Sequence, residues 1–256
     1  MSDHQASEPP KDTFISHLIE LRTRLIRAII AVLVIFLGLV NWARDIYTLL
    51  AQPMLDALPQ GGHMIATDVA GAFFVPMKVT LMVSFLIALP YVLYQAWSFV
   101  APGLYASERK LTAPLLVASV VLFFIGMAFA FFVVFPTVFV FVNKFAPEGV
   151  SVMTDIDKYL TFVLTTFLAF GVTFEVPVVV IVLVKTGVVS VAKLKEIRPY
   201  VIVGAFVAGA IFTPPDVLSQ FLLAGPLCLL YEIGILIASM IVKESVAPAT
   251  DVATRK

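Results

Sequence analysis

The sequence predicts an all-α membrane protein with six transmembrane helices. Apolar residues make up 61% of the 256 residues and charged residues only 13%, which is about half the charged share of a soluble domain. The apolar residues gather in long runs that approach the ~20 residues needed to cross a bilayer. The surplus of apolar side chains therefore has to face lipid rather than water.

Six apolar runs are the candidate spans, and the fifth of them is short. They cover residues 25–42, 76–99, 111–136, 159–186, 199–212 and 217–242. A helix as long as the fifth run reaches only ~21 Å, against a hydrocarbon core of ~30 Å, and Pro214 and Pro215 prevent it from continuing. We expect short fifth and sixth helices that form a tight hairpin and do not cross the bilayer fully.

The basic residues predict the orientation of the bundle. With the N-terminus inside, thirteen lysines and arginines fall on the inner side and four on the outer side. Positive charge collects on the cytoplasmic side of membrane proteins, so both termini are expected in the cytoplasm. The outer residues are Arg44, Lys78, Lys144 and Lys158; the inner ones are Lys11, Arg22, Arg24, Arg27, Arg109, Lys110, Lys185, Lys193, Lys195, Arg198, Lys243, Arg255 and Lys256.

The chain is expected to hold one domain, residues 13–242, between disordered cytoplasmic tails at 1–12 and 243–256. Residues 13–27 predict an amphipathic helix that Thr13 caps and that runs into the first span, because apolar residues recur there at helical spacing. The segment 43–75 is too long and too apolar for a plain connection. It predicts short helices that are broken at Pro53.

The sequence carries no catalytic motif of the common kinds. A phosphate-binding G-x-x-x-x-G-K, a zinc-binding H-E-x-x-H and a nucleophilic G-x-S-x-G are all absent. His4, His17 and His63 fall on both sides of the predicted membrane, and Cys228 is the one cysteine. We therefore predict a protein that is not an enzyme and that uses no metal or cofactor. Its zero net charge also disfavours a nucleic-acid binder.

Two carboxylates lie inside the predicted spans, where a charge is costly and usually faces protein or water. Glu175 precedes Pro177, which should kink the fourth span. Glu175 is either a protonated group bonded to a neighbouring helix, or a group that water reaches, or a polar point that meets a partner or substrate. We favour the last interpretation. Glu232 lies nearer the inner end, where its side chain is more simply explained by reaching the membrane surface.

Three further acidic residues have a plain local explanation. Asp216 suits the N-cap of the sixth helix, and Glu108 suits the first turn of the third. Glu20 and Arg24 are four apart on one helix, a common surface pair that stabilises by ~0.2–0.5 kcal/mol. Glu20 and Glu108 nevertheless stand out as acids on an inner rim rich in lysine and arginine. Such carboxylates suit recognition of a basic peptide, because a guanidinium donates two parallel hydrogen bonds to a carboxylate.

Five segments together resemble the TatC family of the twin-arginine protein translocase. They are HLIELRTR at 17–24, FVAPGLY at 99–105 followed by Glu108 and Arg109, FGVTFEVP at 170–177, RPY at 198–200 and TPPD at 213–216. The resemblance runs from about residue 13 to 242. It implies a glove-like, concave six-helix bundle in the bacterial cytoplasmic membrane that exports folded proteins with the protonmotive force.

The resemblance also implies roles for particular residues. Glu20 and Glu108 would receive the twin arginines of a signal peptide, with Arg22 and Phe99 shaping that surface. Pro53 and Asp216 match positions needed for transport, and Glu175 would lie on the concave face. Thr213 and Gln220 resemble a polar patch where the single-span TatA or TatB subunits dock. A homo-oligomer within a receptor complex is expected.

Two other classes of protein compete with this interpretation. A six-span transporter of small solutes or ions would also carry intramembrane glutamates and proline-broken helices. The sequence shows no internal repeat, however, and the fifth span is too short to line a pore. A structural scaffold without a substrate is the third possibility.

Overall fold

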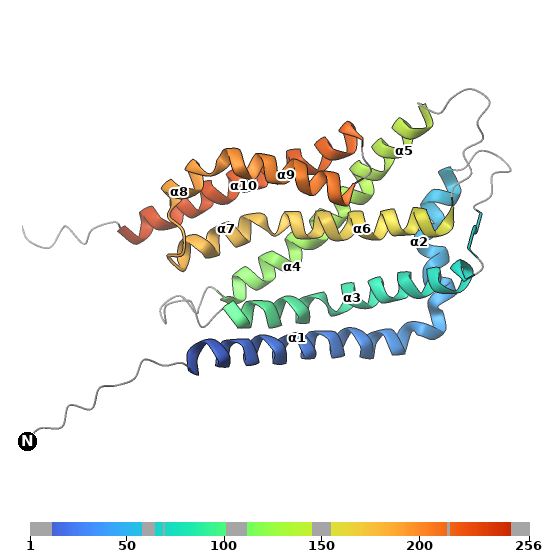
Figure 1. Ribbon diagram of the computed structural model, residues 1–256, viewed down its shortest axis with the longest axis horizontal. Coiled ribbons are helices and arrows are strands. Elements are labelled where there is room, and N and C mark those ends of the chain that lie inside the picture. The colour runs from blue at the N-terminus through green and yellow to red at the C-terminus, as the bar shows by residue number, and fades with distance from the viewer. Residues whose placement is uncertain are drawn as a thin grey trace, which may run out of the picture.

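A computed structural model of the chain consists of helices (Figure 1). It describes residues 12–57, 65–68, 70–100, 112–144, 155–213 and 216–246. Within these ranges the strand-like pairing is limited to an isolated bridge between Ile65 and Asp155. The prediction of an all-α fold is confirmed.

The helices follow one another with few long breaks in the described ranges. In chain order they are α1 (Asp12–Leu39), the 3-10 turn η1 (Val40–Trp42), α2 (Ala43–Ala57), α3 (Gly71–Val100), α4 (Thr112–Phe129), the π-helical turn η4 (Ala130–Val134), α5 (Phe135–Lys144), α6 (Ile156–Phe174), α7 (Val176–Lys185), α8 (Val191–Glu196), α9 (Arg198–Phe212) and α10 (Val217–Val246).

Five stretches of the described residues are long and apolar enough to cross a membrane, and α9 is a shorter apolar helix. The stretches are Ile15–Leu50, Phe73–Phe99, Ala113–Phe141, Ile156–Lys185 and Val217–Ile241. With α9 they match the six predicted spans in order, and the short fifth helix is confirmed. The expected short sixth helix is wrong, because α10 has 30 residues. Pro226 lies inside α10 without ending it, as membrane helices often tolerate.

The helices lie roughly side by side, and α4–α5 crosses the row at an angle (Figure 1). In the row, α1 packs on α3, α4 packs on α6, and α10 packs on α7 and α9. The start of α1 and the end of α10 lie at the same end of the bundle (Figure 1), which we call the terminal end. The opposite end, where α2 lies, we call the α2 end. This arrangement agrees with an even number of crossings.

Three predicted helix boundaries are wrong. Thr13 does not cap α1, because α1 already includes Asp12. Pro53 does not break a helix, because α2 runs through it from Ala43 to Ala57. Pro136 does not end the third span, because the chain continues through it into α5. The π-helical turn Ala130–Val134 lies just before Pro136. Its wider backbone accommodates the proline, which has no N–H to donate and whose ring clashes with the preceding turn of a regular helix.

The fourth predicted span is interrupted at the position where Pro177 was expected to kink it. Helix α6 ends at Phe174 and α7 begins at Val176, with Glu175 between them. The Glu175 N–H donates to the Val172 carbonyl at 3.1 Å, and Pro177 has no N–H to continue the α6 ladder. Pro177 is therefore the local cause of the break between α6 and α7, and Glu175 lies at that break.

The core lies where α4 and α6 cross closely. A Cβ atom on Gly126 of α4 would lie 2.5 Å from the Phe170 carbonyl oxygen of α6, so the position requires glycine. Phe170 itself is fully buried. Close approach at small residues is the usual way membrane helices gain packing contacts. This crossing fixes α4 and α6, and with them Ser119 and Glu175.

The predicted tails are only partly covered by the described residues. Helix α10 runs to Val246, four positions beyond the predicted domain boundary at 242. Residues 1–11 and 247–256 lie outside the described residues.

Candidate functional site

The first candidate site is the rim of the terminal end, where α1 begins and α3 ends. His17, Glu20 and Arg24 recur at intervals of three and four residues, so they share one face of α1. The ring of His17 stacks on the ring of Phe99 near the end of α3, with centroids 4.2 Å apart and planes at 23°. His17 lies one turn before Glu20 on α1, so this contact places the predicted site residue Phe99 against the turn that precedes Glu20.

Glu20 is engaged by a guanidinium of the same helix. Arg24 donates from Nε at 2.9 Å and from Nη2 at 2.6 Å, and both bonds reach the Oε1 atom of Glu20. The Glu20 side chain is 34% exposed and that of Arg24 is 22% exposed. The predicted helix pair is confirmed, and it leaves the carboxylate accessible from the surface.

The remaining predicted rim residues are less constrained. Arg22 is exposed on α1 and lies on a different face from Glu20, because residues two apart on a helix do not face each other. Glu108 and the segment 101–111 lie outside the described residues. The structure therefore places Phe99 against His17, one turn before Glu20 on α1, and leaves the pairing of Glu20 with Glu108 as a prediction.

A second site surrounds Glu175 in the middle of the bundle. Its Oε1 atom is buried and has no hydrogen-bond partner among the described residues. Ser119 of α4 lies near this carboxyl group, and its hydroxyl accepts a hydrogen bond from Trp97 Nε1 on α3 at 3.0 Å. The sequence singled out Glu175 but gave no signal for Ser119 or Trp97, which come from other helices.

The third site lies between α9 and α10. Thr213 is buried, and its hydroxyl donates to the Gly209 carbonyl at 2.7 Å. Asp216 accepts a hydrogen bond from the Ser219 N–H at 2.7 Å, which confirms its N-cap role. A Cβ atom on Gly209 would lie 3.2 Å from Cα of the half-buried Gln220. Thr213 and Gln220 therefore both lie beside Gly209, where α9 and α10 approach closely.

Pro53 lies in α2, at the α2 end of the bundle, and belongs to none of the three sites above. Its side chain is outside the described residues.

The α2 end also carries hydrogen bonds between Thr67 and Asp155 that the sequence did not reveal, and we call this contact the Thr67–Asp155 clasp. Asp155, the N-cap of α6, accepts hydrogen bonds from the Asp157 and Lys158 N–H groups at 2.8 and 3.0 Å and from the Thr67 N–H at 3.1 Å. The Thr67 hydroxyl donates to it as well.

Hydrogen bonding controls the ionisation of Asp155. The Thr67 hydroxyl is the main cause, and the backbone N–H groups of Lys158, Thr67 and Asp157 add to it; together they lower the pKa of Asp155 to about 2. Donors that point at a carboxylate stabilise its charged form. Nearby, Lys78 of α3 donates to Asp157 of α6 at 2.6 Å. The first contact joins the segment before α3 to the start of α6, and the second joins α3 itself to α6.

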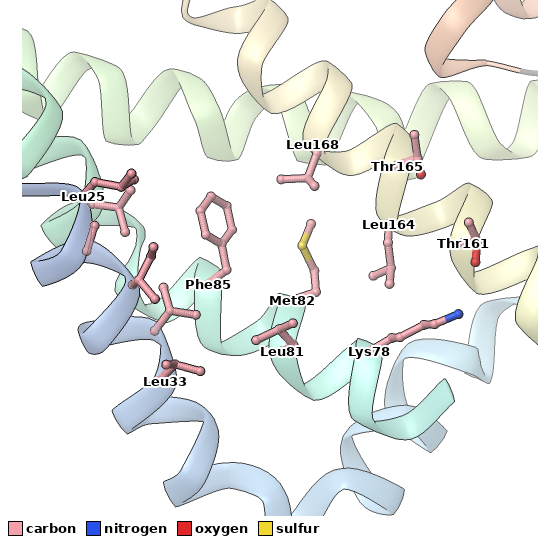
Figure 2. A pocket seen from close by; sticks show the side chains of 14 residues that line it. Leu25, Leu33, Lys78, Leu81, Met82, Phe85, Thr161, Leu164, Thr165 and Leu168 are labelled. Atoms are coloured by element: carbon pink, nitrogen blue, oxygen red, sulfur yellow. The ribbon is translucent and has the colours of Figure 1, made fainter. Parts of the chain in front are cut away.

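An apolar groove of about 710 Å³ opens between α1, α3 and α6. Figure 2 shows Leu25 and Leu33 of α1, Met82 and Phe85 of α3 and Leu168 of α6 around this space. Lys78 and Thr161 lie toward one end of it. The groove agrees with the concave bundle that the resemblance implies.

Comparison with known proteins gives the family directly. Residues 16–226 match the family described as Sec-independent protein translocase protein (TatC). The chain is 58% identical over 221 residues to the Sec-independent protein translocase protein TatC of Escherichia coli strain K12, covering 86% of both chains. It is 53% identical over 237 residues to the TatC protein of Azotobacter chroococcum mcd 1, covering 93% of both.

A solved structure agrees in fold as well as in sequence. The crystal structure of a twin-arginine translocase receptor TatC superposes with a TM-score of 0.78 and 40% sequence identity, over 88% of this chain and 99% of that one. The family match begins at residue 16 in α1 and ends at residue 226 within α10, so it includes the helices between them. This chain therefore belongs to the TatC family of multi-pass membrane subunits of the Sec-independent protein translocase.

Proposed function

We propose that this chain is the core subunit of a twin-arginine translocase and the receptor for its signal peptides. In this role it binds the paired arginines of a signal peptide at the rim of the terminal end. The folded protein behind the signal peptide is then exported across the cytoplasmic membrane with the protonmotive force. The proposal follows from membership of the family and from the chemistry of the rim.

The observation that carries the receptor role is the contact between Glu20 and a guanidinium. Arg24 donates to the Glu20 carboxylate at 2.6 and 2.9 Å, so this carboxylate already has an environment that accepts arginine. Charge-assisted hydrogen bonds of this kind are among the strongest that side chains form. The Glu20 side chain is 34% exposed, which leaves it open to a peptide from the surface. Glu108 supplies the second carboxylate in this proposal.

The rim must face the side from which signal peptides arrive. The excess of lysine and arginine in the segments assigned to the inner side supports a cytoplasmic terminal end. Both termini are then cytoplasmic, and α2 with Pro53 lies on the outer side. The stack of His17 on Phe99 supports a role for Phe99 in holding the end of α3 against the peptide-binding face of α1.

The same proposal assigns partners to the two inner sites. Glu175, whose buried Oε1 atom has no hydrogen-bond partner among the described residues, would bond to an inserted signal peptide or to a partner helix. Single-span TatA or TatB helices would dock on α9–α10 near Thr213 and Gln220, with Asp216 capping α10 beside them. A polar group of a docking helix gains most where it finds a hydrogen-bond partner within the membrane.

Export of a folded reporter tests this proposal. The chain is expressed in bacteria that lack their own TatC protein, and a reporter is fused to a twin-arginine signal peptide. We expect export that a proton uncoupler stops and that a twin-lysine signal peptide greatly reduces. A transporter of small solutes would leave the reporter inside the cell and would act alone in liposomes. That result would contradict the proposed function.

A further inference from the structure

We propose that Arg24 is a built-in competitor for the arginines of the signal peptide. It occupies the Glu20 carboxylate in the unliganded chain, and an incoming guanidinium has to displace it. This inference rests on the proposed receptor role of Glu20 and deepens it, since it names the residue that sets how strongly a cationic peptide must bind. The argument uses the geometry of the pair and its position on α1.

The contact of Arg24 with Glu20 resembles the contact that a peptide arginine would make, but it is less complete. Both hydrogen bonds from Arg24, at 2.9 and 2.6 Å, converge on the single oxygen Oε1. A guanidinium that approaches freely donates two parallel bonds, one to each carboxylate oxygen. Arg24 cannot approach freely, because the helix fixes it four residues from Glu20. A peptide arginine can therefore form the better contact and replace it.

The position of the pair makes Arg24 the competitor rather than another basic residue of α1. Arg22 lies on a different face from Glu20, and Arg27 is exposed two helical turns beyond Glu20. Arg24 is only 22% exposed, so it is held against the protein surface at the site itself. His17 lies one turn before Glu20 and stacks on Phe99, so the pair lies beside the end of α3.

A competitor of this kind sets a threshold for binding. When only a fraction of the receptor has a free site, the apparent affinity of every ligand falls by that fraction. The loss is the same for an arginine peptide and for a lysine peptide. The lysine peptide binds more weakly from the start, because an ammonium lacks the two-pronged geometry of a guanidinium. Arg24 therefore lowers the apparent affinity of weak cationic ligands so far that they no longer bind, while twin-arginine signal peptides still bind.

The test is crosslinking of signal peptides to the full-length chain in membrane vesicles. Peptides with a photoreactive group and either a twin-arginine or a twin-lysine motif are titrated against the parent chain and an Arg24→Gln variant. We expect Arg24→Gln to raise the apparent affinity for both peptides by about threefold, as expected for loss of a partly buried helix pair. The preference for arginine over lysine should remain unchanged, because both peptides are released from the same competitor.

Arg27→Gln is the matched control, because it removes the same charge from the same helix without touching the Glu20–Arg24 pair. A clearly smaller increase in this variant supports the inference. An equal increase in both variants would mean that only net charge matters, and no increase in Arg24→Gln would mean that the pair is an ordinary helix contact. Either result would overturn the inference. Arg24→Lys, expected between the parent and Arg24→Gln, serves if the glutamine variant fails to insert.

A Glu20→Gln variant separates this inference from the proposed function. If that variant keeps the parental preference for arginine, Glu20 is not the receptor and both proposals fail. If it loses the preference while Arg24→Gln binds like the parent, the receptor role stands and only the competitor role of Arg24 is wrong.

Discussion

Arg198, at the start of α9, donates from Nη2 to the Oε2 atom of Glu232 in α10 at 2.5 Å, although 34 positions separate the two residues. Beside this pair, the Tyr231 hydroxyl donates to the Leu194 carbonyl of α8 at 2.8 Å. The two contacts join α8, α9 and α10 at the terminal end. The ion pair also accounts for Glu232 more fully than a side chain that merely reaches the membrane surface.

Loss of this ion pair should have a modest effect on stability. Its side chains are 42% and 49% exposed, and solvent weakens such pairs to ~0–1 kcal/mol. Glu232→Gln should therefore lower the melting temperature in detergent by no more than ~4 °C. The exchange Arg198→Glu with Glu232→Arg should recover most of the loss. If the exchanged variant is no more stable than either single variant, the pair does not stabilise the fold.

Glu175 should be needed for function rather than for folding. Glu175→Ala is expected to reduce export by about tenfold, since loss of a buried hydrogen-bonding group costs ~1–3 kcal/mol in a complex. Glu175→Gln should be milder, because an amide still donates and accepts. Ser119→Ala should weaken export in the same direction, because the Ser119 hydroxyl is a polar group near the Glu175 carboxyl. Export and the amount of inserted protein are measured together. Loss of the protein itself in Glu175→Ala would support a structural role instead.

Asp155 predicts a specific dependence of stability on pH. Its pKa is lowered from an ordinary value of 3.8 to about 2 in the folded chain. A lowered pKa means that the carboxylate stabilises the fold above pH ~4 and loses this effect as the pH falls toward 2. The parent should therefore melt higher than Asp155→Asn at pH 5 to 7, and the difference should shrink between pH 4 and 2. A difference that is constant down to pH 2 would contradict this account of the Thr67–Asp155 clasp.

The distribution of basic residues predicts which segments can be labelled from outside. In a Cys228→Ala background, a cysteine at position 63 should react with a reagent that does not cross the membrane. Cysteines at positions 4 and 250 should react only after the membrane is opened. Labelling of position 4 in intact cells would reverse the orientation and place the rim of Glu20 on the wrong side for signal peptides.

The parts of the fold that the sequence predicted depend on local chemistry. Apolar runs located the spans, and the missing N–H of Pro177 located the break between α6 and α7. The same chemistry misled at Pro53 and Pro136, because α2 continues through the first and a π-helical turn accommodates the second. Such accommodation depends on backbone several residues away and on neighbouring helices, which a single proline does not reveal.

The contacts in the candidate sites divide in the same way, into contacts within one helix that the sequence predicts and contacts between helices that it does not. The pair of Glu20 and Arg24 was predictable, because four residues on one helix fix their distance. The stack of His17 on Phe99, the bond from Trp97 to Ser119 and the pair of Arg198 and Glu232 join residues on different helices. These contacts depend on how α1, α3, α4, α9 and α10 pack together. Neither apolar periodicity nor residue spacing carries that information.

The central claim is that the Glu20 and Glu108 carboxylates bind the paired arginines of a signal peptide. Photocrosslinking of twin-arginine and twin-lysine peptides to Glu20→Ala and Glu108→Ala variants tests it most directly. Loss of one charge-assisted hydrogen bond, ~1.5–3 kcal/mol, should weaken twin-arginine binding about tenfold or more in each variant. The preference for arginine should shrink, and higher salt should weaken the parent's binding. If both variants insert correctly and still prefer arginine as strongly as the parent, these carboxylates are not the receptor.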